Sequence, residues 1–257
     1  MLLFVVIPFY WFPLILWVVD SIKGGKASST TLEDYPFWTT TWRTLFVSIL
    51  VAVFATVAAY PLALVWRFSG PGVRRFLAVI MTAPLILGLL ARNYSWIGML
   101  SSTKAQTSMG WSIVGGNDLI FTPWSVGLVM SCIFVPITFF ILIQGISGVK
   151  ANHIHAARTC GAVDWRIVTF LVIPMTLRAA VLSFGLVLAM AVGYFITPRM
   201  IGGGKTQFIS NIILELLNRG DFSQASRMGL KFLLFMTLPV VMIIWYSLRL
   251  RQRSTGR

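Results

Sequence analysis

Residues 155–162 carry the polar and small side chains with the most informative spacing in this sequence. They form a short polar insert between strongly apolar stretches. In a helix, Ala156 and Ala157 present a small-residue face against which another protein packs closely. Gly161 permits a sharp turn and a close approach between two short helices, and Pro174 marks the return to an apolar segment. The pattern predicts a docking element, not a catalytic centre.

Other reactive side chains do not form a catalytic or metal-binding set. Cys132 lies in an apolar run and Cys160 in the docking element, so neither a mutual disulfide nor a metal site is predicted. His153 and His155 stand two positions apart, hence on different faces of a helix, with no third ligand nearby. Paired carboxylates and a Ser/His/Asp set are missing from the sequence. We expect no enzyme activity, no cofactor and no metal.

The glycine-rich run at residues 202–206 is not a complete nucleotide-binding loop. Gly204-Lys205-Thr206 matches the end of a P-loop, but Arg199 stands where its first glycine is required. We therefore expect that the chain does not hydrolyse ATP itself.

Apolar residues dominate the chain. Hydrophobic residues make up 57% of 257 positions and charged residues 11%, whereas about a quarter of an average soluble domain is charged. A membrane-spanning helix needs about 20 apolar residues. About six runs qualify, at residues 2–22, 45–66, 76–98, 124–146, 179–196 and 230–248. The first is interpreted as a retained span, because it lacks the basic start of a signal peptide. The sequence predicts an all-α polytopic membrane protein with one domain, residues 1–257.

The net charge of +14 is unevenly distributed. Basic side chains follow the second apolar run (Arg67, Arg74 and Arg75), bracket the docking element (Lys150, Arg158, Arg166 and Arg178) and end the sequence (Arg249, Arg251, Arg253 and Arg257). The opposite loops hold most of the acids. By the positive-inside rule, the docking element (about 150–175) and both termini are cytoplasmic, and residues 198–227 form an outer loop. The basic faces predict contacts with anionic lipid headgroups and not with nucleic acid.

Polar residues interrupt the third apolar run near its end. Lipid accommodates Arg92 and Asn93 poorly unless they face water, find partners or reach the interface. Both are therefore candidates to line a solute route near the outer half of the membrane. Tyr94, Trp96 and Tyr194 are further candidates, and interfacial anchoring is the alternative for Tyr94 and Trp96.

The docking element resembles the EAA loop of ABC-importer permeases, which reads Glu-Ala-Ala, three residues, Gly, and Pro thirteen positions later. Ala156, Ala157, Gly161 and Pro174 fall in register, as does Ala162 after the glycine, whereas His155 replaces the acid. The resemblance implies that the first loop helix, with Arg158, lies in a groove of an ATPase subunit. In the family, the acid of the loop is often paired with a basic side chain of the ATPase, and the resemblance implies that His155 does not form this ion pair.

Further segments resemble permeases of the spermidine/putrescine type. These are Arg-Asn-Tyr-x-Trp at residues 92–96, Gly-Gly-Gly-Lys-Thr-Gln at 202–207 after Thr197-Pro198, and Arg-Thr-Leu at 43–45. The resemblance covers roughly residue 42 to the end of the chain.

This resemblance implies a type I importer fold in the bacterial inner membrane. The implied partners are a second homologous permease, two ATP-binding-cassette ATPase subunits and an extracytoplasmic solute-binding protein. It implies alternating access for a polyamine, with opine-like compounds, phosphonates or other small anions as alternatives. A secondary transporter is the remote alternative, since the sequence shows neither inverted repeats nor an intramembrane relay of acids.

Overall fold

The computed structural model describes residues 37–101, 120–149, 151–161, 163–235 and 237. These residues are helical or lie in turns, and no strand occurs among them. The predicted first span, residues 2–22, lies outside them. The predicted last span, 230–248, is described only at its start, within a helix over residues 222–235.

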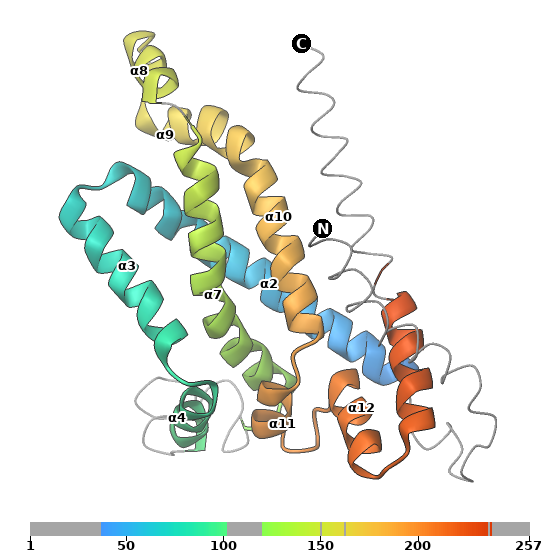
Figure 1. Ribbon diagram of the computed structural model, residues 1–257. Coiled ribbons are helices and arrows are strands. Elements are labelled where there is room, and N and C mark those ends of the chain that lie inside the picture. The colour runs from blue at the N-terminus through green and yellow to red at the C-terminus, as the bar shows by residue number, and fades with distance from the viewer. Residues whose placement is uncertain (1–36, 102–119, 150, 162, 236, 238–257) are drawn as a thin grey trace, which may run out of the picture.

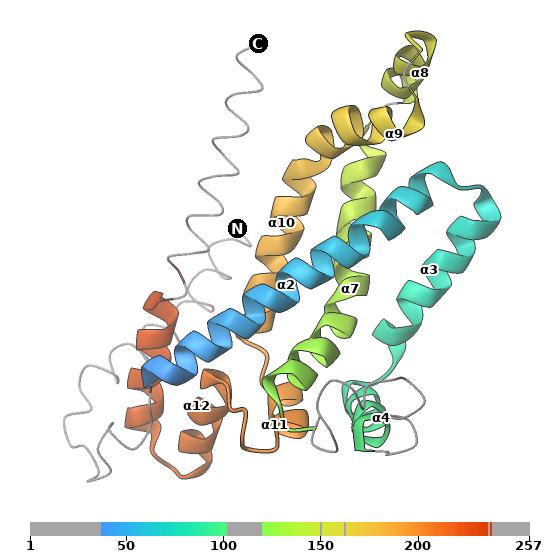
Figure 2. The ribbon, with the colours of Figure 1, turned by 180° about the vertical axis from the view of Figure 1, so that it is seen from behind.

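Three helices of the described chain are long and apolar enough to cross a membrane. They are α2 (Phe37–Phe68), α7 (Pro123–Ser147) and the helix Ile167–Val192, in which a π-helical segment η3 (Ile167–Val172) continues into α10 (Ile173–Val192). Figures 1 and 2 show α2 crossing α7 and α10 obliquely. The predicted spans at 45–66, 124–146 and 179–196 fall largely on these three helices. The third observed helix begins before residue 179 and ends before residue 196.

The third predicted span is broken. Residues 76–98 fold into α3 (Pro71–Ile86) and α4 (Leu89–Ser101), which meet at an angle of 97°. Leu87 ends α3 in an extended conformation (φ −60°, ψ 129°), and Pro84 and Gly88 weaken the helix on either side of it. The sequence predicts a kink at Pro84, and the structure shows a larger break at residues 87 and 88.

Short helices lie at both ends of the long ones. At one end are α8 (Ala151–Thr159) and α9 (Asp164–Arg166). At the opposite end are α4, α11 (Ile196–Gly202), α12 (Ile209–Asn218) and the 222–235 helix. Figures 1 and 2 show α8 projecting from the body of the molecule.

Small side chains allow the long helices to pack closely. Ala52, Ala55 and Ala59 on α2 are fully buried against α7 and α10. On α7, a Cβ atom added at Gly145 would overlap the Cβ of Ala179 on α10. Lipid tails are as apolar as the side chains, so such close packing stabilises helix pairs in a membrane.

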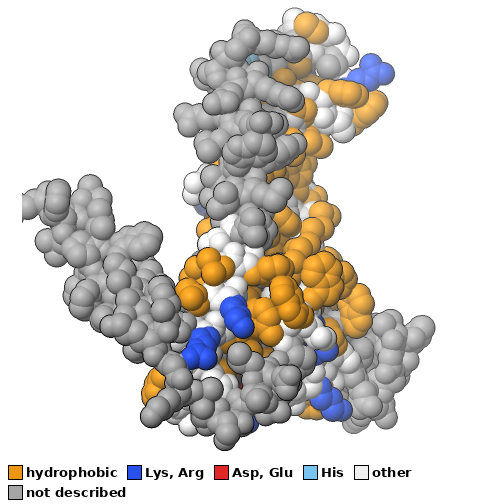
Figure 3. All heavy atoms as spheres, turned by 90° about the vertical axis from the view of Figure 1, so that its right-hand side faces the viewer, with side chains coloured by type: hydrophobic (Ala, Val, Ile, Leu, Met, Phe, Trp, Pro, Cys, Tyr) orange, Lys and Arg blue, Asp and Glu red, His pale blue; other side chains and the backbone are white. Residues whose placement is uncertain are grey.

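The outer faces of these helices remain apolar. Exposed large apolar side chains include Phe46, Phe54, Phe76, Leu182 and Leu186. Figure 3 shows apolar side chains gathered over the middle of one face, with Lys or Arg side chains above and below them. This distribution is that of a chain surrounded by hydrocarbon and bounded by two polar surfaces.

Candidate functional site

The predicted docking element forms a helix and a sharp turn. Helix α8 spans His155, Ala157 and Arg158, and the Gly161 amide donates to the carbonyl oxygen of Arg158 (2.9 Å). Gly161 has a φ of 80°, a backbone conformation that residues other than glycine rarely adopt. A Cβ atom there would meet nothing within 4 Å. The expected close approach of two helices at Gly161 is thus wrong, and the glycine is required by its backbone conformation. Ala162 lies outside the described residues.

The second part of the element is not a separate short helix. The amides of Arg166 and Ile167 both donate to the carbonyl oxygen of Val163 (2.9 and 3.1 Å), and the helix then runs through η3 into α10. The π-helical segment ends two residues before Pro174, which has no amide hydrogen to donate. Residues 164–192 therefore form one continuous helix.

Helix α8 contacts the body of the chain through Ala157. Ala157 packs on the buried cluster that includes Ile146, Val149 and Ile167. His153 and Arg158 are exposed on the same helix. These two exposed side chains are accessible to a second protein.

Exposed apolar side chains lie next to α8 at the same end. Val163 and Trp165 are 59% and 58% exposed, and the Arg166 guanidinium lies 5.5 Å from the centre of the Trp165 ring. Exposed apolar side chains beside polar and cationic ones are typical of a protein-binding surface. Sequence reasoning missed Val163 and Trp165, although both stand in the predicted loop.

Asn93, a predicted route residue, lies inside the chain. Its side chain is fully buried. Its Nδ2 donates to the carbonyl oxygen of Leu89 (2.9 Å), and its Oδ1 accepts a hydrogen bond from Thr197 Oγ1 (2.9 Å). The amide thus joins α4 to α11, and in this structure it does not face an open surface. Thr197 was not recognised from the sequence.

The other route candidates have different surroundings. Arg92 Nη1 donates to the carbonyl oxygen of Pro84 (2.7 Å), so this guanidinium lies at the negative end of α3 across the bend. Tyr194 packs edge-on against Phe134, with ring centres 5.7 Å apart, and its hydroxyl is buried. Trp96 packs on the same core, whereas Tyr94 is 65% exposed. The structure therefore does not bring these side chains together on one open face.

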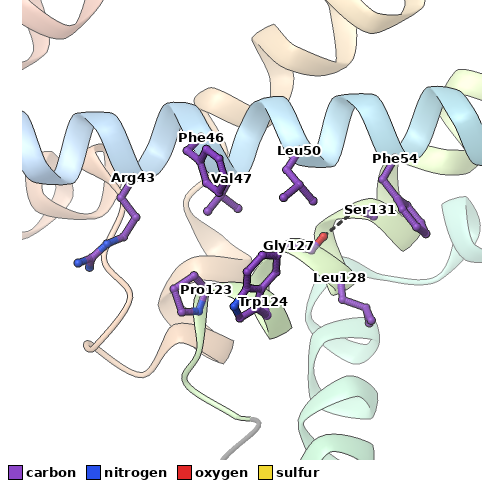
Figure 4. A pocket seen from close by; sticks show the side chains of 10 residues that line it. All are labelled: Arg43, Phe46, Val47, Leu50, Phe54, Pro123, Trp124, Gly127, Leu128 and Ser131. Atoms are coloured by element: carbon purple, nitrogen blue, oxygen red, sulfur yellow. Dashed lines mark hydrogen bonds between the residues drawn. The ribbon is translucent and has the colours of Figure 1, made fainter. Parts of the chain in front are cut away.

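A groove of about 430 Å³ lies between α2 and α7 (Figure 4). Phe46, Leu50 and Phe54 extend from α2 toward Trp124 and Leu128 of α7, and Arg43 stands at one end. Its lining is almost entirely carbon. Because an apolar groove does not replace the hydration of an ionic group, it is unsuited to a charged solute.

The sequence was compared with known protein families. Residues 62–254 match the family described as "Binding-protein-dependent transport system inner membrane component". The chain belongs to this family. Membership in a family of transport-system membrane components confirms the prediction of a transport subunit that is not itself an enzyme, and argues against a secondary transporter.

One relative of the chain is described as a probable ABC transporter permease. The "Probable ABC transporter permease protein y4fN" of Sinorhizobium fredii (strain NBRC 101917 / NGR234) is 26% identical over 192 residues. The match covers 72% of this chain and 33% of the relative, so the chain spans about a third of that protein's length.

Solved structures have the same fold. A chain of a bacterial ABC transporter involved in the import of the acidic polysaccharide alginate superposes with a TM-score of 0.76 at 17% identity, over 98% of this chain and 94% of that one. A chain of the inward-facing MetNI methionine ABC transporter superposes with a TM-score of 0.62 at 16% identity, over 84% of this chain and 95% of that one. These similarities confirm the predicted all-α membrane fold and support the type I importer architecture.

Proposed function

We propose that this chain is the permease subunit of an ATP-driven ABC importer and that α8 couples it to an ATPase subunit. The observation that carries the proposal is the projecting α8 and its Gly161 turn, which precede the continuous helix of α9, η3 and α10 that ends at Val192. A helix held by an ATPase at this point moves α10 when the ATPase closes. Alternating access of the route between two permeases follows from that movement.

The orientation of the chain is part of the proposal. The described basic side chains at the α8 end are Arg67, Arg74, Arg75, Arg158, Arg166 and Arg178. Because α8 is the proposed ATPase contact, we propose that this end lies in the cytoplasm and that α4, α11 and α12 lie at the outer surface. Both termini are then cytoplasmic if six spans are present.

The proposed partners are a second homologous permease, two ATPase subunits and an extracytoplasmic solute-binding protein. The family description names dependence on a binding protein. The alginate transporter has also been solved with an alginate pentasaccharide-bound periplasmic protein, and a chain of that complex superposes on this one with a TM-score of 0.71. The exposed α8 surface, including Arg158, is the proposed ATPase contact.

The proposed cargo is a small solute. The resemblance of residues 92–96 and 202–207 to spermidine/putrescine permeases indicates a polyamine. An anionic solute of the opine or phosphonate type is the second candidate, and the outer segment from residue 196 to 221 favours it. There, Arg199, Lys205 and Arg219 outnumber Glu215 and Asp221.

The proposal is tested by reconstituting the chain with the permease, ATPase and binding protein encoded beside it. We expect no ATP hydrolysis by the chain alone and ATP-dependent solute uptake by the complete assembly. Turnover by the isolated chain, or uptake that needs no ATPase, would contradict it. The matched control is an assembly whose ATPase carries an inactivated Walker motif.

A further inference from the structure

A polar pocket of about 450 Å³ lies at the end of the molecule opposite α8. The side chains that give it its chemistry are Arg199, Gln207, Asn211, Glu215, Asn218 and Arg219. They come from α11, the turn after it and α12. We call this the outer polar pocket, and its lining contrasts with the apolar groove of Figure 4.

The charge of the outer polar pocket favours an anion. Two arginines and one glutamate line it, so the net charge of these side chains is +1. Glu215 already accepts a hydrogen bond from Arg219 Nη2 at 2.6 Å, and this pair sits on one face of α12. Arg199 enters from α11 as the second guanidinium. Guanidinium groups and amide donors together match the oxygens of a carboxylate or phosphonate.

The frame of the pocket is fixed by hydrogen bonds. Asn211 is 6% exposed. With its amide oriented to satisfy both neighbours, it donates to the carbonyl oxygen of Phe195 (2.8 Å) and accepts from the Arg199 amide (3.2 Å). The Ile209 amide donates to Thr44 Oγ1 (3.1 Å), which ties the start of α12 to α2. Because α11 and α12 are held together, the pocket is formed before a ligand arrives, and less ordering accompanies binding.

We propose that the outer polar pocket binds the carboxylate or phosphonate group of a small anionic solute. The inference rests on the proposed function, because that function places this end of the chain where an imported solute arrives. It selects the anionic candidate over the polyamine, since a polycation is repelled by Arg199 and Arg219. An anionic lipid headgroup offers similar oxygens, and the test must separate the two.

The test is calorimetric titration of the purified full chain in nanodiscs of neutral phosphatidylcholine. Succinate and methylphosphonate serve as anionic probes and putrescine as the cationic one. We expect at least one anion to bind and putrescine not to bind. Arg199→Gln should weaken anion binding about tenfold or more, and Glu215→Gln should strengthen it, because the removed carboxylate no longer competes. Lys205→Gln is the matched control, since Lys205 is exposed beside the pocket but does not line it.

The proposal is overturned if neither anion binds, if putrescine binds, or if Arg199→Gln and Lys205→Gln have equal effects. Replacing part of the phosphatidylcholine with phosphatidylglycerol should leave anion binding within about twofold. Displacement by that lipid would overturn the small-solute assignment in favour of a headgroup site. The titration needs no ATPase, so its result is independent of whether the reconstituted assembly shows ATP-driven uptake.

Discussion

Gly161→Val should abolish most ATP-driven uptake while the protein still inserts and accumulates in the membrane. The native φ of 80° at this position is unfavourable for a residue with a side chain, by about 1–2 kcal/mol. That free energy corresponds to about a 5- to 30-fold shift away from the native turn. Since the turn sets the direction of α8 relative to the continuous helix that follows, its loss should separate ATPase closure from movement of α10.

The control for this prediction is Gly161→Asn, because asparagine tolerates the left-handed region better than other side chains. No neighbouring atom lies within 4 Å of an added Cβ, so both variants test backbone conformation without a clash inside the chain. Uptake is measured in assembled importers and normalised to the amount of permease in the membrane. Wild-type uptake by Gly161→Val would show that the turn does not serve coupling.

Asn93→Leu should lower the thermal stability of the purified chain more than any change at an exposed position of α4. The substitution leaves the buried Thr197 hydroxyl without its acceptor, at a cost of about 1–3 kcal/mol. The measurement is the unfolding midpoint in a fixed detergent. Ser95→Ala is the matched control, since Ser95 is exposed and its hydroxyl donates to the Ala91 carbonyl oxygen of its own helix.

A double-mutant cycle with Thr197→Val identifies the partner. Because Asn93 and Thr197 share one hydrogen bond, the double variant should be more stable than the sum of the two losses implies, by about 0.5 kcal/mol or more. Additive losses would mean that the α4–α11 contact does not depend on this pair. If Asn93→Leu is as stable as the wild type, the structural role of Asn93 is contradicted, and lining the solute route is the remaining interpretation.

The long spans and the helix and turn over residues 151–161 could be predicted because their signals are local. A run of apolar residues is sufficient to identify α2 and α7. The spacing of Ala156, Ala157 and Gly161 is likewise a local signal, which does not depend on how the membrane helices pack. Hydropathy does not report the direction of a helix axis, however, so the apolar run did not reveal the 97° angle between α3 and α4. Pro84 predicts a kink in this run, but not its size, and Gly88 was the signal that sequence reasoning left unused.

The surroundings of the polar residues could not be predicted, because they depend on contacts far apart in the sequence. Asn93 is buried through a hydrogen bond to Thr197, which follows it by 104 residues. The outer polar pocket similarly requires α11 to meet α12 through Asn211. Residue type alone does not distinguish a polar side chain that lines a route from one that joins two helices.

The native thiol of Cys160 offers the most direct measurement of the central claim, that the α8 loop is the cytoplasmic contact with the ATPase. Cys160 is free and exposed one residue before Gly161. In a Cys132→Ser background, a membrane-impermeant maleimide should label Cys160 in inside-out vesicles but not in intact cells. Assembly with the ATPase should protect the thiol. Labelling from outside the cell, or equal labelling with and without the assembled ATPase, would contradict the account.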